Sequence, residues 1–380
     1  MKLKPFLLDQ WLNQHQHSAD KSIKYDLASS TGPAWTVREV VDLLGPDRWQ
    51  KVLDAPMSYV HASGSTALRE AIAQMEGVHP DNIQIVTGAA EGLLILFFLA
   101  AEPGANVVLP FPGYPPFDAL PSSFGTEIRF YNVRRENGFV IDVDEIIGLT
   151  DANTKLVLVN SPHNPTGTTV SDQQIDALHD FTADRGIQLV IDQVYHPIYH
   201  GAETRSASRL PHATVLGDFS KALSLPGLRV GWIVERDRHR MEQYCDTRSY
   251  FTVSNTPVGE ALAAAAVLHR DEIFSRIRRA AADNLTALDS FFSRMSGVLD
   301  WVRPTGGVTA FPWLIDGSDS RAMCKTAADS GLLLAPGDCW GIPDHFRLGF
   351  GEVEHGFTEA LEILERVLGR AGRGRAGATS

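Results

Sequence analysis

The sequence predicts an α/β fold, with a three-layer α/β/α large domain around a mostly parallel sheet and a smaller α+β domain. Short apolar runs at 106–110, 155–160 and 187–191 alternate with stretches of helical periodicity. Such alternation is typical of βαβ units, which place successive strands in parallel and cover the sheet with helices. The chain has 380 residues, which is long for one compact core, so a second domain is expected.

Composition and charge exclude several classes of protein. Hydrophobic residues make up 44% and charged residues 21%, which is typical of a globular protein. The net charge of −12 argues against nucleic acid or an anionic membrane as a partner. The apolar start is too short for a signal peptide and no apolar run approaches the ~20 residues of a membrane span, so we expect a cytoplasmic protein. Three widely spaced cysteines form no cluster, and no metal site is expected.

The first predicted elements are a polar loop, a helix and a strand that leads into a second helix. The polar stretch 25–33, which ends in Gly-Pro, is expected to be a loop. Thr66, a few residues after Tyr59, is a suitable N-cap for a helix with apolar residues at helical spacing. The stretch 83–92 then runs from a strand to a helix through small residues. Free amides at such a helix N-terminus can bind an anion.

The middle of the chain repeats strand, turn and helix. A short strand at 106–110 leads into a proline-rich turn that holds Tyr114 in a fixed place. The next predicted elements are a strand at 127–133, a helix at 142–149, a strand at 155–160 and a helix at 171–185. Between the last two, the prolines around Asn164 leave that side chain few conformations.

The buried strand predicted at 187–191 ends in Asp192. A carboxylate at the carboxyl end of a parallel strand lies where open α/β sheets bind their ligands. The five apolar or strand-like residues before it fit an ordinary solvent-exposed aspartate poorly. Asp192 is therefore a candidate site residue.

Lys221 is the centre of the pattern. It follows an apolar run at 213–216, and Arg229 precedes a second one at 230–234. A lysine between two buried strands is costly unless it is used. A desolvated amine can form a Schiff base with an aldehyde cofactor, and a nearby arginine can bind the phosphate of that cofactor.

The segment 215–232 resembles the lysine signature of the class I/II aminotransferases, which are pyridoxal-phosphate-dependent enzymes of fold type I. Matching motifs extend in the family's order from Tyr59 to Arg347. The resemblance implies the PLP-dependent transferase fold and pyridoxal 5'-phosphate (PLP) as cofactor. It also implies a homodimer that acts on small-molecule amino acids and 2-oxo acids.

The resemblance implies a role for each matching residue. Lys221 would form the Schiff base and move the α-proton, and Asp192 would keep the pyridine nitrogen protonated. Tyr195 and Asn164 would bind the ring oxygen. The remaining cofactor contacts would come from the backbone of Ala89, Ala90 and Glu91, the ring of Tyr114, Ser220, the guanidinium of Arg229, and Tyr59, which would reach across to the other subunit.

Substrate binding is expected at Arg347, a single arginine among apolar residues of a predicted strand. An arginine held in this way offers a bidentate fork to a carboxylate, and the resemblance assigns it the substrate α-carboxylate, next to Asn164. In the family the segment near residue 30 covers the active site, so Thr31 and Trp35 are candidates for the pocket lining. An ordinary connecting loop explains these two residues equally well.

One departure from the family pattern concerns the phosphate site. Three residues before the lysine, where the family usually has Ser or Thr on the phosphate, this chain has Asp218. An anion beside phosphate is disfavoured, so we leave Asp218 outside the predicted site. We also find no second arginine for a side-chain carboxylate, and aspartate is therefore not supported as a substrate.

The resemblance divides the chain into two domains. The large PLP-binding domain is expected at 46–270. Residues 1–45 and 271–370 would form the small domain and the segment that covers the active site. The stretch 371–380, rich in Gly, Arg and Ala, is expected to be a disordered tail.

The implied function is transfer of an amino group between an L-amino acid and a 2-oxo acid through a Lys221 Schiff base. The alternative is a PLP-dependent lyase or cyclase of non-protein amino acid biosynthesis. It arises because 220–232 and 306–312 are also similar to the capreomycidine synthases of this family. A catalytically silent PLP-binding regulator is a third reading, which the presence of Lys221 disfavours.

Overall fold

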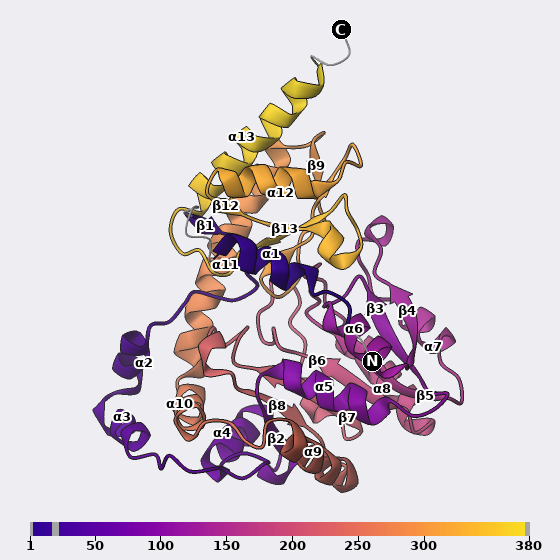
Figure 1. Ribbon diagram of the computed structural model, residues 1–380, viewed down its shortest axis with the longest axis vertical. Coiled ribbons are helices and arrows are strands. Elements are labelled where there is room, and N and C mark those ends of the chain that lie inside the picture. The colour runs from indigo at the N-terminus through magenta and orange to yellow at the C-terminus, as the bar shows by residue number, and fades with distance from the viewer. Residues whose placement is uncertain (1–2, 17–22, 377–380) are drawn as a thin grey trace.

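The computed structural model describes residues 3–16 and 23–376, and it confirms the predicted α/β class (Figure 1). Its centre is a seven-stranded, mostly parallel sheet. In order across the sheet, the strands are β2 (Ile83–Val86), β8 (Gly231–Val234), β7 (Ala213–Asp218), β6 (Gln188–Asp192), β5 (Thr154–Asn160), β3 (Asn106–Phe111) and β4 (Glu127–Asn132). Strand β8 runs antiparallel to both of its neighbours, and the other pairs are parallel.

Helices cover both faces of this sheet and complete the three layers. One face packs against α5 (Ala89–Ala100), α6 (Pro116–Phe124) and α9 (Arg238–Phe251). The other packs against α4 (Thr66–Glu76), α7 (Val143–Gly148), α8 (Asp172–Asp184) and α10 (Pro257–Val267). Successive strand residues enter opposite cores, as Val215 and Leu216 do on β7. Both faces are therefore buried, which explains the continuous apolar runs of the sequence.

The 25-residue helix α11 (Arg270–Arg294) connects the sheet to a second, smaller group of elements, in the upper part of Figure 1. They are β9 (Leu299–Asp300), β10 (Thr309–Ala310), β11 (Trp313–Leu314), α12 (Ser320–Asp329), β12 (Leu332–Leu333), β13 (Ala335–Pro336), β14 (Phe346–Gly349) and α13 (Phe357–Ala376). Strand β14 lies between β10 and β13.

Helix α13 differs from the expected disordered tail at 371–380. The helix continues to Ala376, and residues 371–376 combine two glycines with two alanines and two arginines, which have high helix propensity. Residues 377–380 lie outside the described part of the chain.

The N-terminal segment joins both parts of the molecule. Helix α1 (Leu7–Gln16) is anchored to the smaller part by the Trp11 indole, whose Nε1 donates to the Leu334 carbonyl at 2.8 Å. Strand β1 (Tyr25–Asp26) pairs in parallel with β12. Helices α2 (Val37–Leu44) and α3 (Pro46–Leu53) instead pack against α10. Helix α2, within the range 1–45 that we expected in the small domain, therefore lies against the large one.

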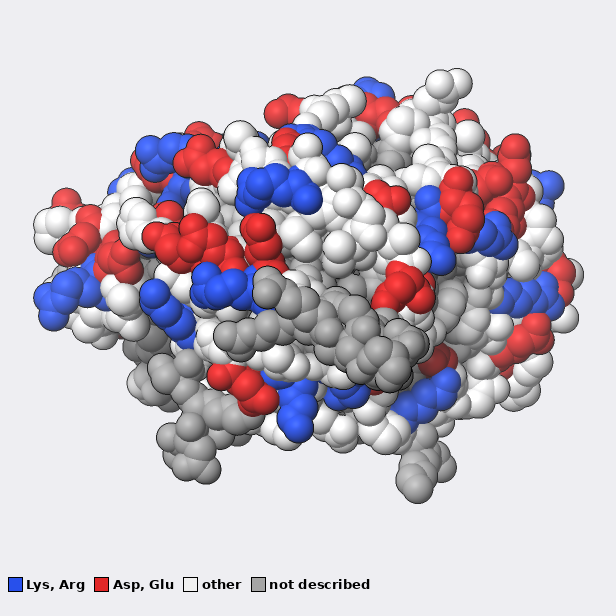
Figure 2. All heavy atoms as spheres, turned by 90° about the horizontal axis from the view of Figure 1, so that it is seen from above, with Lys and Arg blue, Asp and Glu red and all other residues white. Residues whose placement is uncertain are grey.

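The surface carries charges of both signs. On the face seen in Figure 2, Lys and Arg side chains are interspersed with Asp and Glu side chains, and no large patch of one sign forms there. Among the described residues, no helix combines the length and the apolar character that crossing a membrane requires.

Candidate active site

A cavity of about 280 Å³ lies beside the sheet, where the carboxyl ends of β5, β6 and β7 bring polar side chains together. Helix α1 and strand β14 of the smaller part close it from the other side. The predicted site residues that line it are Ala89, Ala90, Tyr114, Asn164, Asp192, Ser220, Lys221, Arg229 and Arg347.

The Lys221 amine is enclosed in this cavity. Its Nζ donates a hydrogen bond to the Ser30 hydroxyl at 2.9 Å. Burial, together with the positive charge of Arg347, lowers the pKa of Lys221 to about 8. A substantial fraction of the amine is therefore neutral and nucleophilic near neutral pH.

Asp192 is 4% exposed at the end of β6. Its carboxylate accepts a hydrogen bond from the Val194 amide at 3.2 Å and forms no ion pair with any residue that the structure describes. Burial, and to a smaller extent the charge of Asp218, raises the pKa of Asp192 to about 7. A cation bound in the cavity would remove the cost of this buried carboxylate.

Tyr195 and Asn164 lie near this carboxylate. The buried Tyr195 hydroxyl has no partner of hydrogen-bond geometry among the described residues. Burial raises the pKa of Tyr195, while the charge of Arg347 acts in the opposite direction. The backbone N–H of Asn164 donates to Asn160 Oδ1 at 2.7 Å, which fixes the turn after β5. An unpartnered buried hydroxyl is unusual and leaves a donor for a ligand.

Arg347 is a buried cation with neutral partners only. The side chain is 2% exposed. Its Nη1 donates to Asn164 Oδ1 at 3.1 Å and its Nη2 to the Ala28 carbonyl at 2.6 Å, while Nε has no partner among the described residues. A buried guanidinium without a carboxylate is costly. The arrangement therefore favours a carboxylate ligand.

The N-terminus of α5 faces Arg229 across a narrow gap. A Cβ on Gly88 would lie 2.6 Å from Arg229 Nη2, and a Cβ on Gly231 would lie 2.7 Å from the Ala89 amide nitrogen. Arg229 has a left-handed backbone conformation (φ 53°), and its Nη1 donates to the Ser220 hydroxyl at 3.4 Å. The glycines therefore make room for a helix N-terminus and an arginine to act together as an anion cup, which we define as Gly88, Ala89, Ser220 and Arg229.

Two residues of the cavity were missed by sequence reasoning. Asp218, which we left outside the site, lines the cavity and accepts hydrogen bonds from the Ala89 amide at 2.6 Å and from the Ser220 amide. It is tolerated because backbone amides bind its charge. Its place three residues before Lys221, at the end of β7, was the available signal. Ser30 was considered only as part of the backbone at 29–31, and its hydroxyl, the partner of Lys221, was missed.

Five predicted residues do not line the cavity of this chain, and one of them is the buried Tyr195 described above. The Glu91 side chain turns away from the anion cup to Arg248, whose Nε lies 3.4 Å from it. Thr31 donates to Glu352 at 3.0 Å, and the Trp35 ring packs under the Arg276 guanidinium. Tyr59 is 85% exposed.

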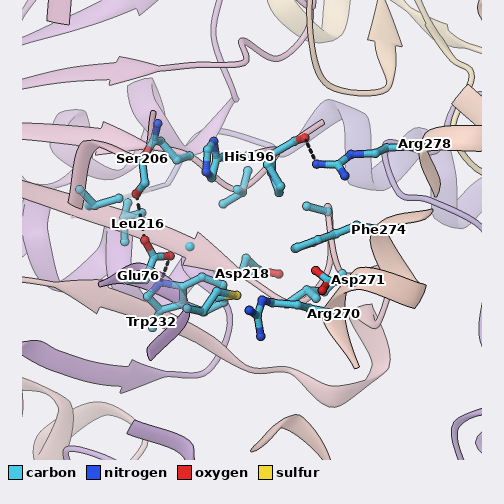
Figure 3. A pocket seen from close by; sticks show the side chains of 18 residues that line it. Glu76, His196, Ser206, Leu216, Asp218, Trp232, Arg270, Asp271, Phe274 and Arg278 are labelled. Carbon is cyan, nitrogen blue, oxygen red and sulfur yellow. Dashed lines mark hydrogen bonds between the residues drawn. The ribbon is translucent and has the colours of Figure 1, made fainter. Parts of the chain in front are cut away.

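A second cavity, of about 250 Å³, lies behind the first (Figure 3). Asp218 and Val194 line both cavities. Figure 3 shows Glu76 in its wall, hydrogen-bonded to Ser206 at 2.9 Å and to Trp232 at 3.2 Å. Burial raises the pKa of Glu76, and Ser208 supplies a further hydrogen bond at 2.7 Å. The Glu76 carboxyl is thus satisfied within the protein.

Comparison with known proteins agrees with this geometry. The model of the family described as aminotransferase class I and II matches residues 54–364. Capreomycidine synthase from Streptomyces vinaceus is 31% identical over 379 residues, covering 97% of this chain and 95% of that protein. A PLP-dependent aminotransferase from Streptococcus suis 89-1591 has a TM-score of 0.90 at 26% identity, covering 97% of this chain and 99% of its own. The PLP-dependent cyclase OrfR has a TM-score of 0.88 at 27% identity, covering 98% of both chains.

The family match covers most of the chain, and the relatives align along nearly all of it. The resemblance seen around Lys221 is thereby confirmed. The chain belongs to the class I and II aminotransferase family.

Proposed function

We propose that the chain is a PLP-dependent enzyme that acts at the α-carbon of an L-amino acid, and that its reaction is transamination. The observation that carries this proposal is Arg347, a buried guanidinium without a carboxylate, in the same cavity as the Lys221 amine. The lysine amine can react with an aldehyde cofactor, and the arginine can bind the carboxylate of an α-amino acid whose amine meets that cofactor.

The residues present fit PLP. The unpartnered Tyr195 hydroxyl suits the ring oxygen, the buried Asp192 carboxylate suits the ring nitrogen, and the anion cup with Arg229 suits the phosphate. Tyr114 lies at the cavity wall, where its ring can pack on the cofactor. When bound, the cofactor supplies an electron sink that acidifies the α-carbon of the amino acid.

The protein's own groups orient the substrate and move its proton. Arg347 binds the α-carboxylate, and Asn164 holds one arm of that guanidinium in place. Lys221 Nζ takes the α-proton and returns it, since a pKa of about 8 lets the amine exchange protons near neutral pH. Ser30 holds Nζ at the edge of the cavity, and α1 covers the site from the side of the smaller part.

We also propose a homodimer in which Tyr59 completes the site of the other subunit. Tyr59 and Met57 are among the most exposed large side chains of the molecule, and so is Tyr250 near the end of α9. The two segments adjoin, because Arg248 Nη1 donates to the Ala62 carbonyl at 2.6 Å. Exposed aromatic and apolar side chains that lie together are typical of a protein interface.

The second candidate is elimination with ring closure on a non-protein amino acid. The observation that favours it is the full-length similarity to capreomycidine synthase and to the PLP-dependent cyclase OrfR. The same lysine, carboxylate and arginine would serve both reactions, because each begins with removal of the α-proton.

A panel of L-amino acids, including basic and hydroxylated ones, tests both candidates. The PLP-loaded protein would be incubated with each compound, and the products identified by mass spectrometry. Transamination predicts the matching 2-oxo acid in amounts that grow when a second 2-oxo acid is added. Elimination and cyclisation predict loss of water or ammonia from the amino acid without an acceptor. An absence of Lys221-dependent PLP binding would reject the proposed function.

A further inference from the structure

The anion cup of this chain already holds a negative charge of its own. Asp218 Oδ2 accepts the Ala89 amide at 2.6 Å, and Asp218 Oδ1 accepts the Ser220 amide. The same Ala89 amide begins α5 and points into the gap that Arg229 closes. Each backbone amide has one proton, so an amide that serves the Asp218 carboxylate cannot serve a phosphate oxygen equally well.

Asp218 also stands between two cavities. It lines the cavity of Lys221 and the second cavity behind it, where Figure 3 shows its carboxylate among the wall residues with Arg270 close to the same opening. The second cavity measures about 250 Å³, which is ample for a carboxylate. The side chain therefore has open space behind it when the amides are taken by another anion.

We propose that Asp218 is a resident competitor for the cofactor phosphate, which must displace the carboxylate from the Ala89 and Ser220 amides toward the second cavity. This inference rests on the proposed function and deepens it, because it assigns the affinity for phosphate to one residue. Two anions that share a helix N-terminus repel each other, and the cup binds only one of them at full strength.

The inference predicts how the phosphate contributes to cofactor binding. Replacement by serine (Asp218→Ser) removes the competing charge and leaves a hydroxyl that can donate to phosphate. The dissociation constant for PLP is expected to fall about tenfold or more, because like-charge repulsion in the cup disappears. Pyridoxal lacks the phosphate, so its dissociation constant is expected to stay within about twofold of the wild-type value.

The test titrates the full-length protein, freed of cofactor by dialysis, with PLP and with pyridoxal, and follows fluorescence quenching. Asp218→Asn removes the charge at nearly constant shape. Its dissociation constant for PLP is expected to lie between those of wild type and Asp218→Ser. Asp9→Asn is the matched control, because Asp9 lines the same cavity but bonds Asn13 and no cup amide. It is expected to leave the ratio of the two dissociation constants unchanged.

A folded Asp218→Ser variant with unchanged or weaker PLP binding would overturn the inference. If that variant does not fold, Asp218→Asn decides by the same criterion. Inorganic phosphate provides an arm that is independent of the cofactor: it should raise the melting temperature of Asp218→Ser more than that of wild type, and an equal rise overturns the inference. If wild type and Lys221→Ala bind PLP equally well, the proposed function is refuted instead. The experiment with inorganic phosphate still tests the role of Asp218 in that case.

Discussion

Two cations face the cavity, the half-buried Lys221 and the buried Arg347, and their polar partners differ. Lys221 has one hydroxyl partner and a pKa lowered to about 8, so it can lose its charge. Arg347 has two neutral acceptors, and burial lowers its pKa, but a guanidinium stays charged at any working pH. The lysine is therefore suited to chemistry, whereas the arginine is suited to binding an anion.

The role of Arg347 predicts a binding defect on substitution. Arg347→Gln is expected to raise the KM for the amino acid substrate about a hundredfold, because a charged hydrogen-bonded contact is lost from a buried site. PLP binding, measured by fluorescence, should change little. Arg347→Lys should recover only part of the loss, because an ammonium lacks the bidentate fork. Equal KM values for wild type and Arg347→Gln would show that the carboxylate binds elsewhere.

The pKa of Lys221 predicts the pH dependence of its reaction with an aldehyde. An amine reacts when neutral, and burial favours the neutral form, so the inflection moves down from the usual value near 10.5 to about 8. The initial rate of pyridoxal capture, followed by visible absorbance, should rise with pH and level off above that point. Lys221→Ala should show no such phase. An inflection close to the ordinary lysine pKa would contradict the enclosed environment.

Single residues were predictable where a motif and a strand end coincide. Lys221 and Asp192 follow apolar runs and Arg347 stands alone within one, and the structure brings all three to one cavity. Asp218 also follows an apolar run, but its partner is a backbone amide 129 residues away. A sequence pattern does not reveal which backbone amides are free to bind a distant carboxylate. Charge alone therefore argued for its exclusion.

The β7–β8 connection is the element that organises the site. Strand β8 returns antiparallel beside β7, so Lys221 and Arg229 lie on one short crossing at the carboxyl end of β7. The crossing abuts the N-terminus of α5, which follows the neighbouring strand β2. The apolar runs predicted the strands, but the sequence did not indicate which of them is antiparallel, since that depends on tertiary pairing.

The tight contact between Gly88 and Arg229 yields a prediction with a matched control. In Gly88→Ala the new Cβ would meet Arg229 Nη2 at 2.6 Å, so PLP binding should weaken about tenfold. Gly45 has nearly the same backbone conformation (φ 74°, ψ 168°, against φ 73°, ψ 161° for Gly88) and open space around it. Gly45→Ala should therefore cost comparable stability, about 1–3 kcal/mol, and leave PLP binding unchanged. Thermal melts and PLP titrations separate the two effects. Equal PLP affinities in both variants would mean that Arg229 does not need this gap.

At the scale of the whole molecule, the N-terminal segment contacts both the sheet domain and the smaller part. Strand β1 pairs with β12, and α1 lies against the same smaller part, while α2 and α3 extend along α10. The order of strand-like and helix-like segments along the sequence predicts the broad division into a sheet domain and a smaller part. The path of residues 37–53 does not, because two short amphipathic helices can pack equally well on either part.

The proposed dimer predicts complementation between two inactive variants. Lys221→Ala and Tyr59→Ala each impair both sites of their own homodimer if Tyr59 acts across the interface. In a mixed dimer, one site carries both defects and the other carries neither. Co-expression with separate tags should therefore restore about half of the sites in the doubly tagged fraction, which is about a quarter of all sites, measured as activity. Inactive mixed dimers, or active Tyr59→Ala homodimers, would contradict a role for Tyr59 in the other subunit's site.

Arg347 connects three distant stretches of chain, because it lies on β14 and donates hydrogen bonds to Ala28 and Asn164. An arriving carboxylate can use the remaining N–H groups, including Nε, but any turn of the guanidinium toward it would shift the hydrogen bond to Ala28. Binding in the pocket and the position of the Ala28 backbone would therefore be coupled. A substitution of this arginine that is made to change substrate selectivity would then also weaken the attachment of the N-terminal segment around Ala28. Redesign at this position should accordingly be judged by hydrogen exchange near residue 28 as well as by turnover.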